Sequence, residues 1–234
     1  MPDFRLVSYN IRKAVGTDWR RDPVRVLKVI AEMSPDIAIL QEADRRLPPR
    51  PSALPPEAIH GLTGLVPLRP PGRGPSLGWH GNAILVRPEL IVQQVQPIDL
   101  PGLEPRGALA ASLRLPGGLL RVTGAHLGLL RRNRREQLTA LLHHAADAPE
   151  PAQVMAGDFN EWSRQVGLGR LARRFDIHAP GRSFHASLPM AALDRIATAG
   201  LTVAGGGVLE TALARKASDH LPIWLDLDFP QRPA

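Results

Sequence analysis

The chain contains no cysteine among its 234 residues. This absence excludes a disulfide framework, a cysteine-ligated zinc site and a thiol nucleophile. Aromatic residues make up only 4% of the chain, so the composition gives no sign of an aromatic platform for stacking single-stranded bases. The sequence also lacks any run of 18 apolar residues, and no transmembrane helix is therefore expected.

Lysine is nearly absent as well. All but three of the 29 basic residues are arginines, and the formal net charge is +7. One interpretation is a GC-rich genome, because Arg, Ala, Gly, Pro and Leu are all abundant. The other is an anionic partner such as nucleic acid, a lipid headgroup or a phosphate ester, since the planar guanidinium can make two hydrogen bonds to one phosphate. Composition alone leaves both interpretations open.

The first five residues lack the basic and then apolar layout of a signal peptide. We therefore expect a soluble cytoplasmic protein, monomeric, with one domain over residues 1–234, a length that can bury a core without staples. Prolines are concentrated between residues 48 and 75. This density disfavours regular helices and paired strands, and we interpret the segment as a surface excursion of that domain.

Short apolar segments with strand character alternate with two clear helical patterns. One helix is predicted from Pro23, with Asp22 as its cap, and ends before Pro35. A second is predicted to begin near Asn133, because Glu136 follows at capping-box spacing, and a weaker helix is expected after Ser163. Runs of strands mixed with β-α-β alternation predict a layered α/β sandwich of mixed sheets. The predicted strands cover residues 4–10, 37–41, 82–86, 108–115, 119–127, 153–159, 193–198, 201–209 and 223–229.

Polar side chains recur where these strands finish, or just before the last strand begins. Each one alone can be a turn or capping residue, but repetition at several strand ends favours a ligand site. Carboxylate and amide oxygens without cysteine suit Mg²⁺ or Mn²⁺. Histidines near carboxylates can act as acid and base near neutral pH. Such a set can hydrolyse a phosphoester, and its members are Asn10, Gln41, Glu42, His126, Asp158, Asn160, Asp194, Asp219 and His220.

Six short motifs in order resemble the endonuclease/exonuclease/phosphatase superfamily, which has the DNase I-like fold. The resemblance is strongest to short bacterial members of undefined substrate, and it spans nearly the whole chain. It implies a four-layer α/β/β/α sandwich with its site at one end of two packed sheets. It also implies a divalent-metal-dependent phosphoester hydrolase, with nucleases among the candidates. The motifs occupy residues 8–12, 40–42, 124–127, 157–160, 193–196 and 218–222.

The resemblance also implies roles for individual residues. Glu42, with Asn10 nearby, would hold Mg²⁺ or Mn²⁺, and Asp219 would lie close to the ion. Asp158 would orient or deprotonate the attacking water. Asn160 would hold the phosphate.

Two histidines complete the implied site. His220, oriented by Asp194, would be a general base or a phosphate contact. His126 would contact the phosphate or protonate the leaving oxygen. The family resemblance leads us to expect a carboxylate partner for His126 from residues 79–83, yet that segment contains none.

Other hydrolase patterns fit less well. Residues 74–78 match G-x-S-x-G, but Ser76 lies among prolines and not on a strand-to-helix turn. The adjacent residues 218–220 cannot supply the spatial contacts of a catalytic triad. The remaining histidines lack zinc-ligand spacing, and only His80 is retained as a candidate site contact.

Four arginines follow His126 closely, at positions 131, 132, 134 and 135. They form either a solvated helix start or a phosphate-binding patch. The second interpretation is supported by the helix macrodipole, because cations at a helix N-terminus are unfavourable unless another interaction compensates them. Arg131 is the first candidate phosphate contact. Two further candidates are Arg106 and Asn82.

Three functions follow from these patterns. The chain could be a metal-dependent phosphodiesterase acting on nucleic acid, a phosphodiesterase or phosphatase acting on a lipid headgroup or small phosphoester, or a non-catalytic binding module. The complete set of candidate metal ligands and histidines argues against the third. The arginines beside His126 favour a polyanionic substrate.

Overall fold

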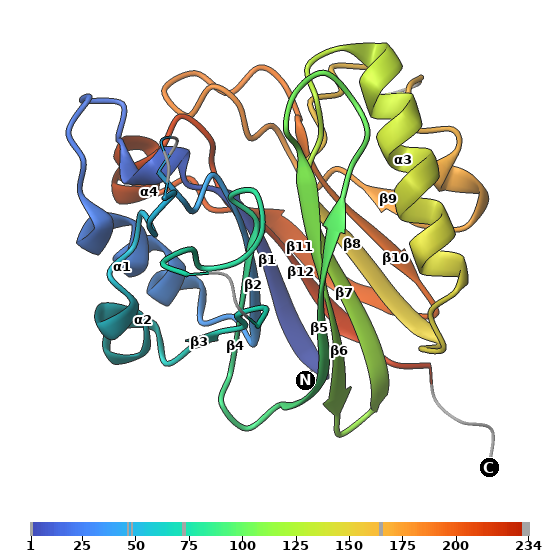
Figure 1. Cartoon of the computed structure of the whole chain (residues 1–234). Coiled ribbons are helices and arrows are strands. Elements are labelled where there is room, and N and C mark those ends of the chain that lie inside the picture. The colour runs from blue at the N-terminus through green and yellow to red at the C-terminus, as the bar shows by residue number, and fades with distance from the viewer. Residues whose placement is uncertain (1, 46, 48, 72–73, 164–165, 231–234) are drawn as a thin grey trace.

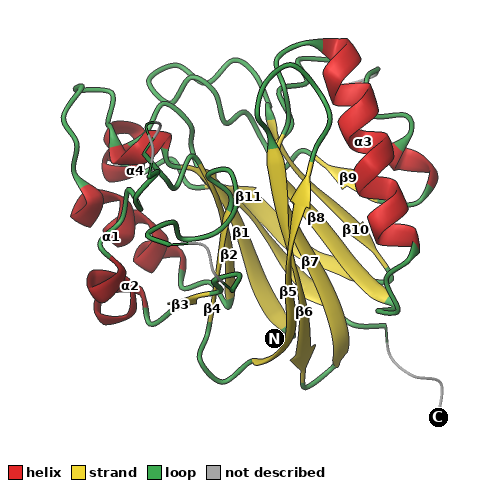
Figure 2. Cartoon of the chain, viewed as in Figure 1, coloured by secondary structure: helices red, strands yellow, loops and turns green. Residues whose placement is uncertain are grey.

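The computed structural model describes residues 2–230 apart from 46, 48, 72–73 and 164–165 (Figure 1). Within this part, the strands form two six-stranded mixed sheets that pack face to face. Helices cover both outer faces (Figure 2). The predicted α/β/β/α arrangement is confirmed. No helix of the described residues is long and apolar enough to cross a membrane.

The first sheet is built around the N-terminal strand β1 (Phe4–Asn10). Strand β1 is parallel to β2, with Asn10 level with Gln41, and antiparallel to β12. The strand order is β11 (Thr202–Val208), β12 (Ile223–Asp228), β1 (Phe4–Asn10), β2 (Ile37–Gln41), β4 (Ala83–Val86) and β3 (Val66–Pro67).

The second sheet has β7 and β8 at its centre. These two strands are parallel, with His126 level with Asp158. Strand β10 runs antiparallel to β8, with Asp194 also level with Asp158. The strand order is β5 (Ile91–Asp99), β6 (Gly107–Leu115), β7 (Gly118–His126), β8 (Ala152–Asp158), β10 (Asp194–Ala199) and β9 (Asp176–His178).

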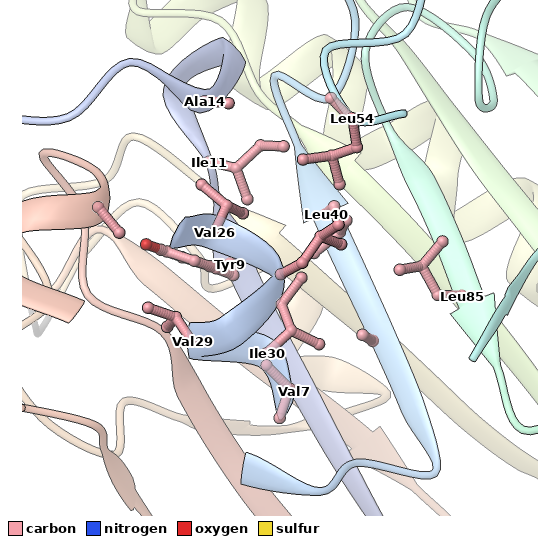
Figure 3. Packing of buried hydrophobic residues seen from close by; sticks show 14 of the residues in the cluster. Val7, Tyr9, Ile11, Ala14, Val26, Val29, Ile30, Leu40, Leu54 and Leu85 are labelled. Carbon is pink, nitrogen blue, oxygen red and sulfur yellow. The ribbon is translucent and has the colours of Figure 1, made fainter. Parts of the chain in front are cut away.

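Strand alternation decides which side chains face the interface between the sheets. Successive side chains on a strand point to opposite faces. Leu6 and Val154 are therefore buried between the sheets. Val7 and Tyr9 point the other way and pack beneath helix α1 (Pro23–Met33) (Figure 3). The same alternation turns Asn10 towards the second sheet.

Helix α1 (Pro23–Met33) lies on the outer face of the first sheet with α2 (Pro56–Thr63) and α4 (Ala212–Ala217). The Asp22 carboxylate caps α1 by accepting from the Arg25 backbone N at 3.0 Å, as predicted. The helix ends at Ser34, which adopts a left-handed conformation before Pro35.

Helix α3 (Arg131–Ala146) covers the second sheet and begins earlier than predicted. Its N-cap is Leu130, which has no side-chain capping bond. The predicted capping role of Asn133 is wrong, because Asn133 is buried inside the first turn. The loop before α3 is held from inside the helix instead, where Gln137 Oε1 accepts from the Gly128 backbone N at 2.8 Å.

The proline-rich segment contains regular structure, contrary to prediction. Helix α2 starts where proline is tolerated, since the first turn of a helix needs no N–H donors. Strand β3 is a two-residue edge strand paired with β4, a position that also tolerates proline. The elements β5, β9 and α4 were not predicted from the sequence either. Of the helix expected after Ser163, residues 164–165 lie outside the described part of the chain. Residues 166–170 are not helical, and a single 3₁₀ turn follows at Leu171–Arg173.

Candidate active site

The strand registers bring four polar side chains to one end of the interface between the sheets. Asn10 comes from β1, His126 from β7, Asp158 from β8 and Asp194 from β10, and all four are buried. Asn10 Nδ2 donates to Asp158 Oδ2 at 3.0 Å, which joins the two sheets at this end. The sequence predicted this convergence from the strand ends.

Asp158 is the centre of the cluster. Its Oδ2 lies 3.4 Å from His126 Nε2 and 3.6 Å from His220 Nε2. Its Oδ1 accepts from the Asn160 backbone N at 3.0 Å. Asn160 adopts a left-handed φ of 50°, and its Nδ2 donates to the Leu127 carbonyl at 2.9 Å. Both oxygens of the central carboxylate therefore face nitrogen donors.

Asp194 orients the His220 ring. His220 Nδ1 lies 2.8 Å from Asp194 Oδ2, and the Ser183 hydroxyl donates to the same oxygen. Because Nδ1 carries the proton directed at Asp194, Nε2 is turned towards Asp158. The Phe184 ring packs on His220 with centroids 4.9 Å apart.

The two histidines differ in protonation state near neutral pH. Burial lowers the pKa of His220, but the carboxylate of Asp194, supported by Asp158 and Asp219, raises it to about 9. Burial lowers the pKa of His126 to about 4, and the nearby Asp158 only partly offsets this. The cluster therefore presents an imidazolium at His220 and a neutral imidazole at His126.

Asp158 itself is ionised between them. Burial opposes its charge, but the charges of the two histidines and the bonds from Asn160 and Asn10 lower its pKa below the ordinary value. A buried carboxylate held ionised in this way can accept a proton or orient a water.

Two further carboxylates, Glu42 and Asp219, each contact a cation from the turn after β1. Lys13 Nζ bonds to Glu42 Oε2, and Arg12 Nε lies 3.3 Å from Asp219 Oδ2. Neither cation was assigned a role from the sequence, although Arg12 is the last residue of the motif at residues 8–12 and Lys13 follows it.

The chemistry of this donor set fits a hard divalent cation. Glu42, Asp219 and Asn10 Oδ1 offer carboxylate and amide oxygens, which Mg²⁺ and Mn²⁺ prefer. The protein cations on both carboxylates demonstrate that this edge of the site attracts positive charge. In the part of the chain that the structure describes, no three His, Cys, Asp or Glu side chains are already placed so that together they could hold a metal ion.

The candidate phosphate contacts differ in their surroundings. Arg106 Nη2 pairs with Glu104 Oε2 at 2.8 Å, and its charge contributes to the lowered pKa of His126. Asn82 is buried and donates to the Gly107 carbonyl at 2.8 Å, so its amide group holds the end of β6. His80 Nδ1 lies 2.9 Å from the Pro105 carbonyl, in the same loop as Arg106.

Glu104 lies in the loop between β5 and β6, next to the segment that follows His126. Burial opposes the charge of Glu104, but the hydrogen bond that its Oε1 accepts from the Leu129 backbone N at 3.1 Å and its pairing with Arg106 lower its pKa below the ordinary value. The carboxylate that contacts His126 is Asp158, at 3.4 Å, and not a residue of the segment 79–83.

The four arginines after His126 separate into two groups. Arg134 is buried, and its Nη2 pairs with Glu161 Oε2 at 3.0 Å, so the interpretation of Arg134 as a phosphate contact is wrong. The other three are exposed, and with Arg170 they line an open hollow of about 690 Å³ on α3. The members of this arginine hollow are Arg131, Arg132, Arg135 and Arg170.

Two exposed tryptophans flank the site, and neither was predicted from the sequence to have a role. Trp19 is 77% exposed and lies beneath Arg12, whose Cζ is 4.4 Å from the ring centroid. Trp162 is 65% exposed and meets Phe184 edge to face, with centroids 6.1 Å apart. The feature that draws attention to them is their exposure beside the cluster around Asp158, which only the structure reveals.

Comparisons with known proteins agree with this fold. A model of the endonuclease/exonuclease/phosphatase family matches residues 7–220. The uncharacterized protein YbhP of Escherichia coli K12 is 32% identical over 158 residues, which is 62% of this chain and 62% of YbhP, less than two thirds of its length. The endonuclease/exonuclease/phosphatase of Beutenbergia cavernae has a TM-score of 0.74 at 24% identity, over 98% of this chain and 72% of that chain. TDP2 of D. rerio, complexed with a single-strand DNA product, has a TM-score of 0.71 at 18% identity, over 96% of this chain and 98% of that chain.

Proposed function

Since the chain belongs to the endonuclease/exonuclease/phosphatase family, we propose that it is a divalent-metal-dependent phosphoester hydrolase that uses in-line attack by an activated water. The observation that supports this most directly is the ionised Asp158, held between two histidines and Asn10 where the two sheets meet. A carboxylate so placed is suited to activate water.

Asp158 is the base in this proposal. His220 is already protonated near neutral pH, because its pKa is about 9, so it cannot accept the proton of the water. Asp158 is ionised, and its Oδ2 faces both histidines. The water would give its proton to Asp158 while the imidazolium of His220 neutralises charge on the phosphate.

His126 and Asn160 act on the other oxygens of the phosphoester. His126 is neutral near pH 7, so its ring can hydrogen-bond the leaving oxygen without adding a charge. Asn160 is fixed by the Leu127 carbonyl and the Asp158 carboxylate. Its amide group is thereby oriented in advance for the phosphate, which is how binding groups stabilise a transition state most effectively.

Glu42, Asp219 and Asn10 are the residues that would hold Mg²⁺ or Mn²⁺. When bound, such an ion stabilises the developing negative charge on the phosphoryl oxygens. The role of this chain's residues is to supply oxygen ligands at the end of β2 and before β12, beside the catalytic cluster.

A matched pair of variants tests the proposal. With bis(p-nitrophenyl) phosphate and Mg²⁺ or Mn²⁺, we expect hydrolysis that EDTA abolishes. Glu42→Gln should lose activity while Glu89→Gln, an exposed turn residue, should keep it. Full activity in EDTA or in the Glu42 variant would contradict the metal assignment, and no turnover of any phosphoester would favour a non-catalytic module.

Nucleic acid is the substrate class that we favour, because the arginine hollow supports a polyanion. Arg131, Arg135 and Arg170 line it with one acidic neighbour, Glu136, which pairs with Arg132 at 3.1 Å. Several exposed cations near one active site suit a substrate with several phosphates. Hydrolysis of plasmid or abasic DNA would support this assignment, whereas hydrolysis confined to phosphoinositides, sphingomyelin or small diesters would support the alternative.

A further inference from the structure

The turn after β1 has an unusual backbone. Arg12, Lys13 and Ala14 have φ values of 45°, 57° and 61°, in the left-handed region that residues other than glycine seldom adopt. Two hydrogen bonds hold the turn in this form. Lys13 N donates to the Glu42 carbonyl at 3.0 Å, and Arg12 N donates to Asn10 Oδ1 at 3.1 Å. A disfavoured conformation that its surroundings enforce at an active site indicates a role for the side chains that it aims.

The turn directs one cation to each of the two carboxylates Glu42 and Asp219. The two cations are held in different ways. Arg12 is fixed from three sides, by Asp219, by the face of Trp19 and by the Gly16 carbonyl, to which Nη1 donates at 3.3 Å. Lys13 pairs with Glu42 through an ammonium at the end of a flexible stem. An ammonium is a compact, strongly hydrated charge that moves more easily than a stacked guanidinium.

We propose that Lys13 is the protein's own cation at the metal site. Its ammonium neutralises Glu42 when no divalent cation is bound, and it leaves Glu42 when Mg²⁺ or Mn²⁺ binds there. The inference rests on the proposed function, which makes Glu42 a metal ligand. Two cations at one carboxylate oxygen repel each other strongly in a partly buried site, so Lys13 and the metal compete for Glu42.

The exchange has a consequence for the substrate. Once released from Glu42, the Lys13 ammonium stays beside the site because its backbone remains bonded to the Glu42 carbonyl. An ammonium in that position can bind a phosphate oxygen.

The scarcity of lysine makes the exchange directly measurable. The chain has three lysines, Lys13, Lys28 and Lys216, so the acetylation rate of each can be followed by peptide mass spectrometry. We expect saturating Mg²⁺ to raise the rate at Lys13 several-fold. The rates at Lys28, exposed on α1, and at Lys216, at 3.7 Å from Asp18, should not change. An unchanged rate at Lys13 with the metal bound would overturn the inference.

Calorimetric titration with Mn²⁺ provides a second readout that needs no substrate. Lys13→Gln removes the competing cation, so the Kd for Mn²⁺ should fall by about fivefold, the scale of a partly exposed ion pair. Lys13→Arg, which keeps a cation, should resemble the wild type, and Lys28→Gln is the matched control for charge.

The outcomes separate this inference from the proposed function. An unchanged or weaker affinity for Mn²⁺ in Lys13→Gln would overturn the exchange alone, even if EDTA abolishes hydrolysis in the wild type. A wild-type protein that binds neither Mg²⁺ nor Mn²⁺ would overturn both.

Discussion

At the scale of single residues, environment gives similar side chains different roles. His126 and His220 both face Asp158, but only His220 has a second carboxylate at its other ring nitrogen. Burial acts on both rings, and Asp194 reverses its effect at His220 alone. The protonation states follow from this one difference, and they favour Asp158 over His220 as the base.

Removing the charge of Asp194 tests this explanation. In Asp194→Asn, metal-free and in EDTA, the pKa of His220 should fall well below about 9, because only Asp158 and Asp219 then oppose the effect of burial. Titration of the imidazole by NMR measures it, with His126 as the internal reference that stays neutral down to about pH 4. A His220 pKa that remains near 9 in the variant would contradict the assigned cause.

The same shift has a consequence for stability. Because folding raises the pKa of His220, its protonated form stabilises the folded protein. This contribution is complete below the ordinary pKa of 6.5 and is lost as the pH rises through about 9. Urea unfolding of the metal-free protein should therefore give a free energy that falls between these values, and the fall should disappear in His220→Gln.

At the scale of elements, the buried pair Arg134–Glu161 joins α3 to the loop after β8. Arg134 Nη2 bonds to Glu161 Oε2 at 3.0 Å, and Arg134 Nη1 also donates to the Leu129 carbonyl. Glu161 directly follows Asn160, so the pair connects the helix to the residue that is proposed to hold the phosphate.

Breaking this pair should be costly. Arg134→Met leaves Glu161 buried without its partner, which typically costs about 3 to 5 kcal/mol of unfolding free energy. Arg132→Ala, which removes an exposed pair with Glu136 on the same helix, should cost no more than about 0.5 kcal/mol. Urea denaturation of both variants measures the difference, and equal losses would show that the buried pair has no special part in the fold.

The elements themselves could largely be predicted, but loop contacts could not. Alternating apolar residues placed β1, β7 and β8 correctly, and their last residues form the cluster around Asp158. Arg134 was misread because its burial depends on Glu161, which the spacing of charges along a helix does not reveal. Glu104 and Lys13 reach the site from loops, whose conformation follows from backbone hydrogen bonds rather than from periodicity.

At the scale of the whole molecule, positive charge is unevenly placed. The arginine hollow lies at the start of α3. Its three arginines on that helix follow His126 in the chain by five to nine residues. Arg114 is exposed at the other end of the same sheet, beside Leu119. A polyanion that binds across the active site would contact the first group and not the second.

Salt dependence tests this distribution. Each duplex phosphate that the protein neutralises contributes a slope of about −0.9 in log K against log salt. Changing Arg131, Arg132 and Arg135 to Gln should flatten the slope for DNA by up to about three such increments and weaken binding to all sequences alike. Arg114→Gln should leave the slope unchanged. No affinity for DNA at low salt, together with brisk hydrolysis of a small diester, would reject nucleic acid as the substrate.

The most direct single measurement is the turnover of Asp158→Asn with bis(p-nitrophenyl) phosphate and saturating Mn²⁺. Asp158 is the residue on which both sheets and both histidines converge, whereas Asp147→Asn, at the exposed end of α3, changes the same group elsewhere. If Asp158 activates the water, its variant should lose about 10²- to 10⁴-fold in kcat while Asp147→Asn stays at the wild-type rate. Wild-type turnover in Asp158→Asn would contradict the proposed chemistry.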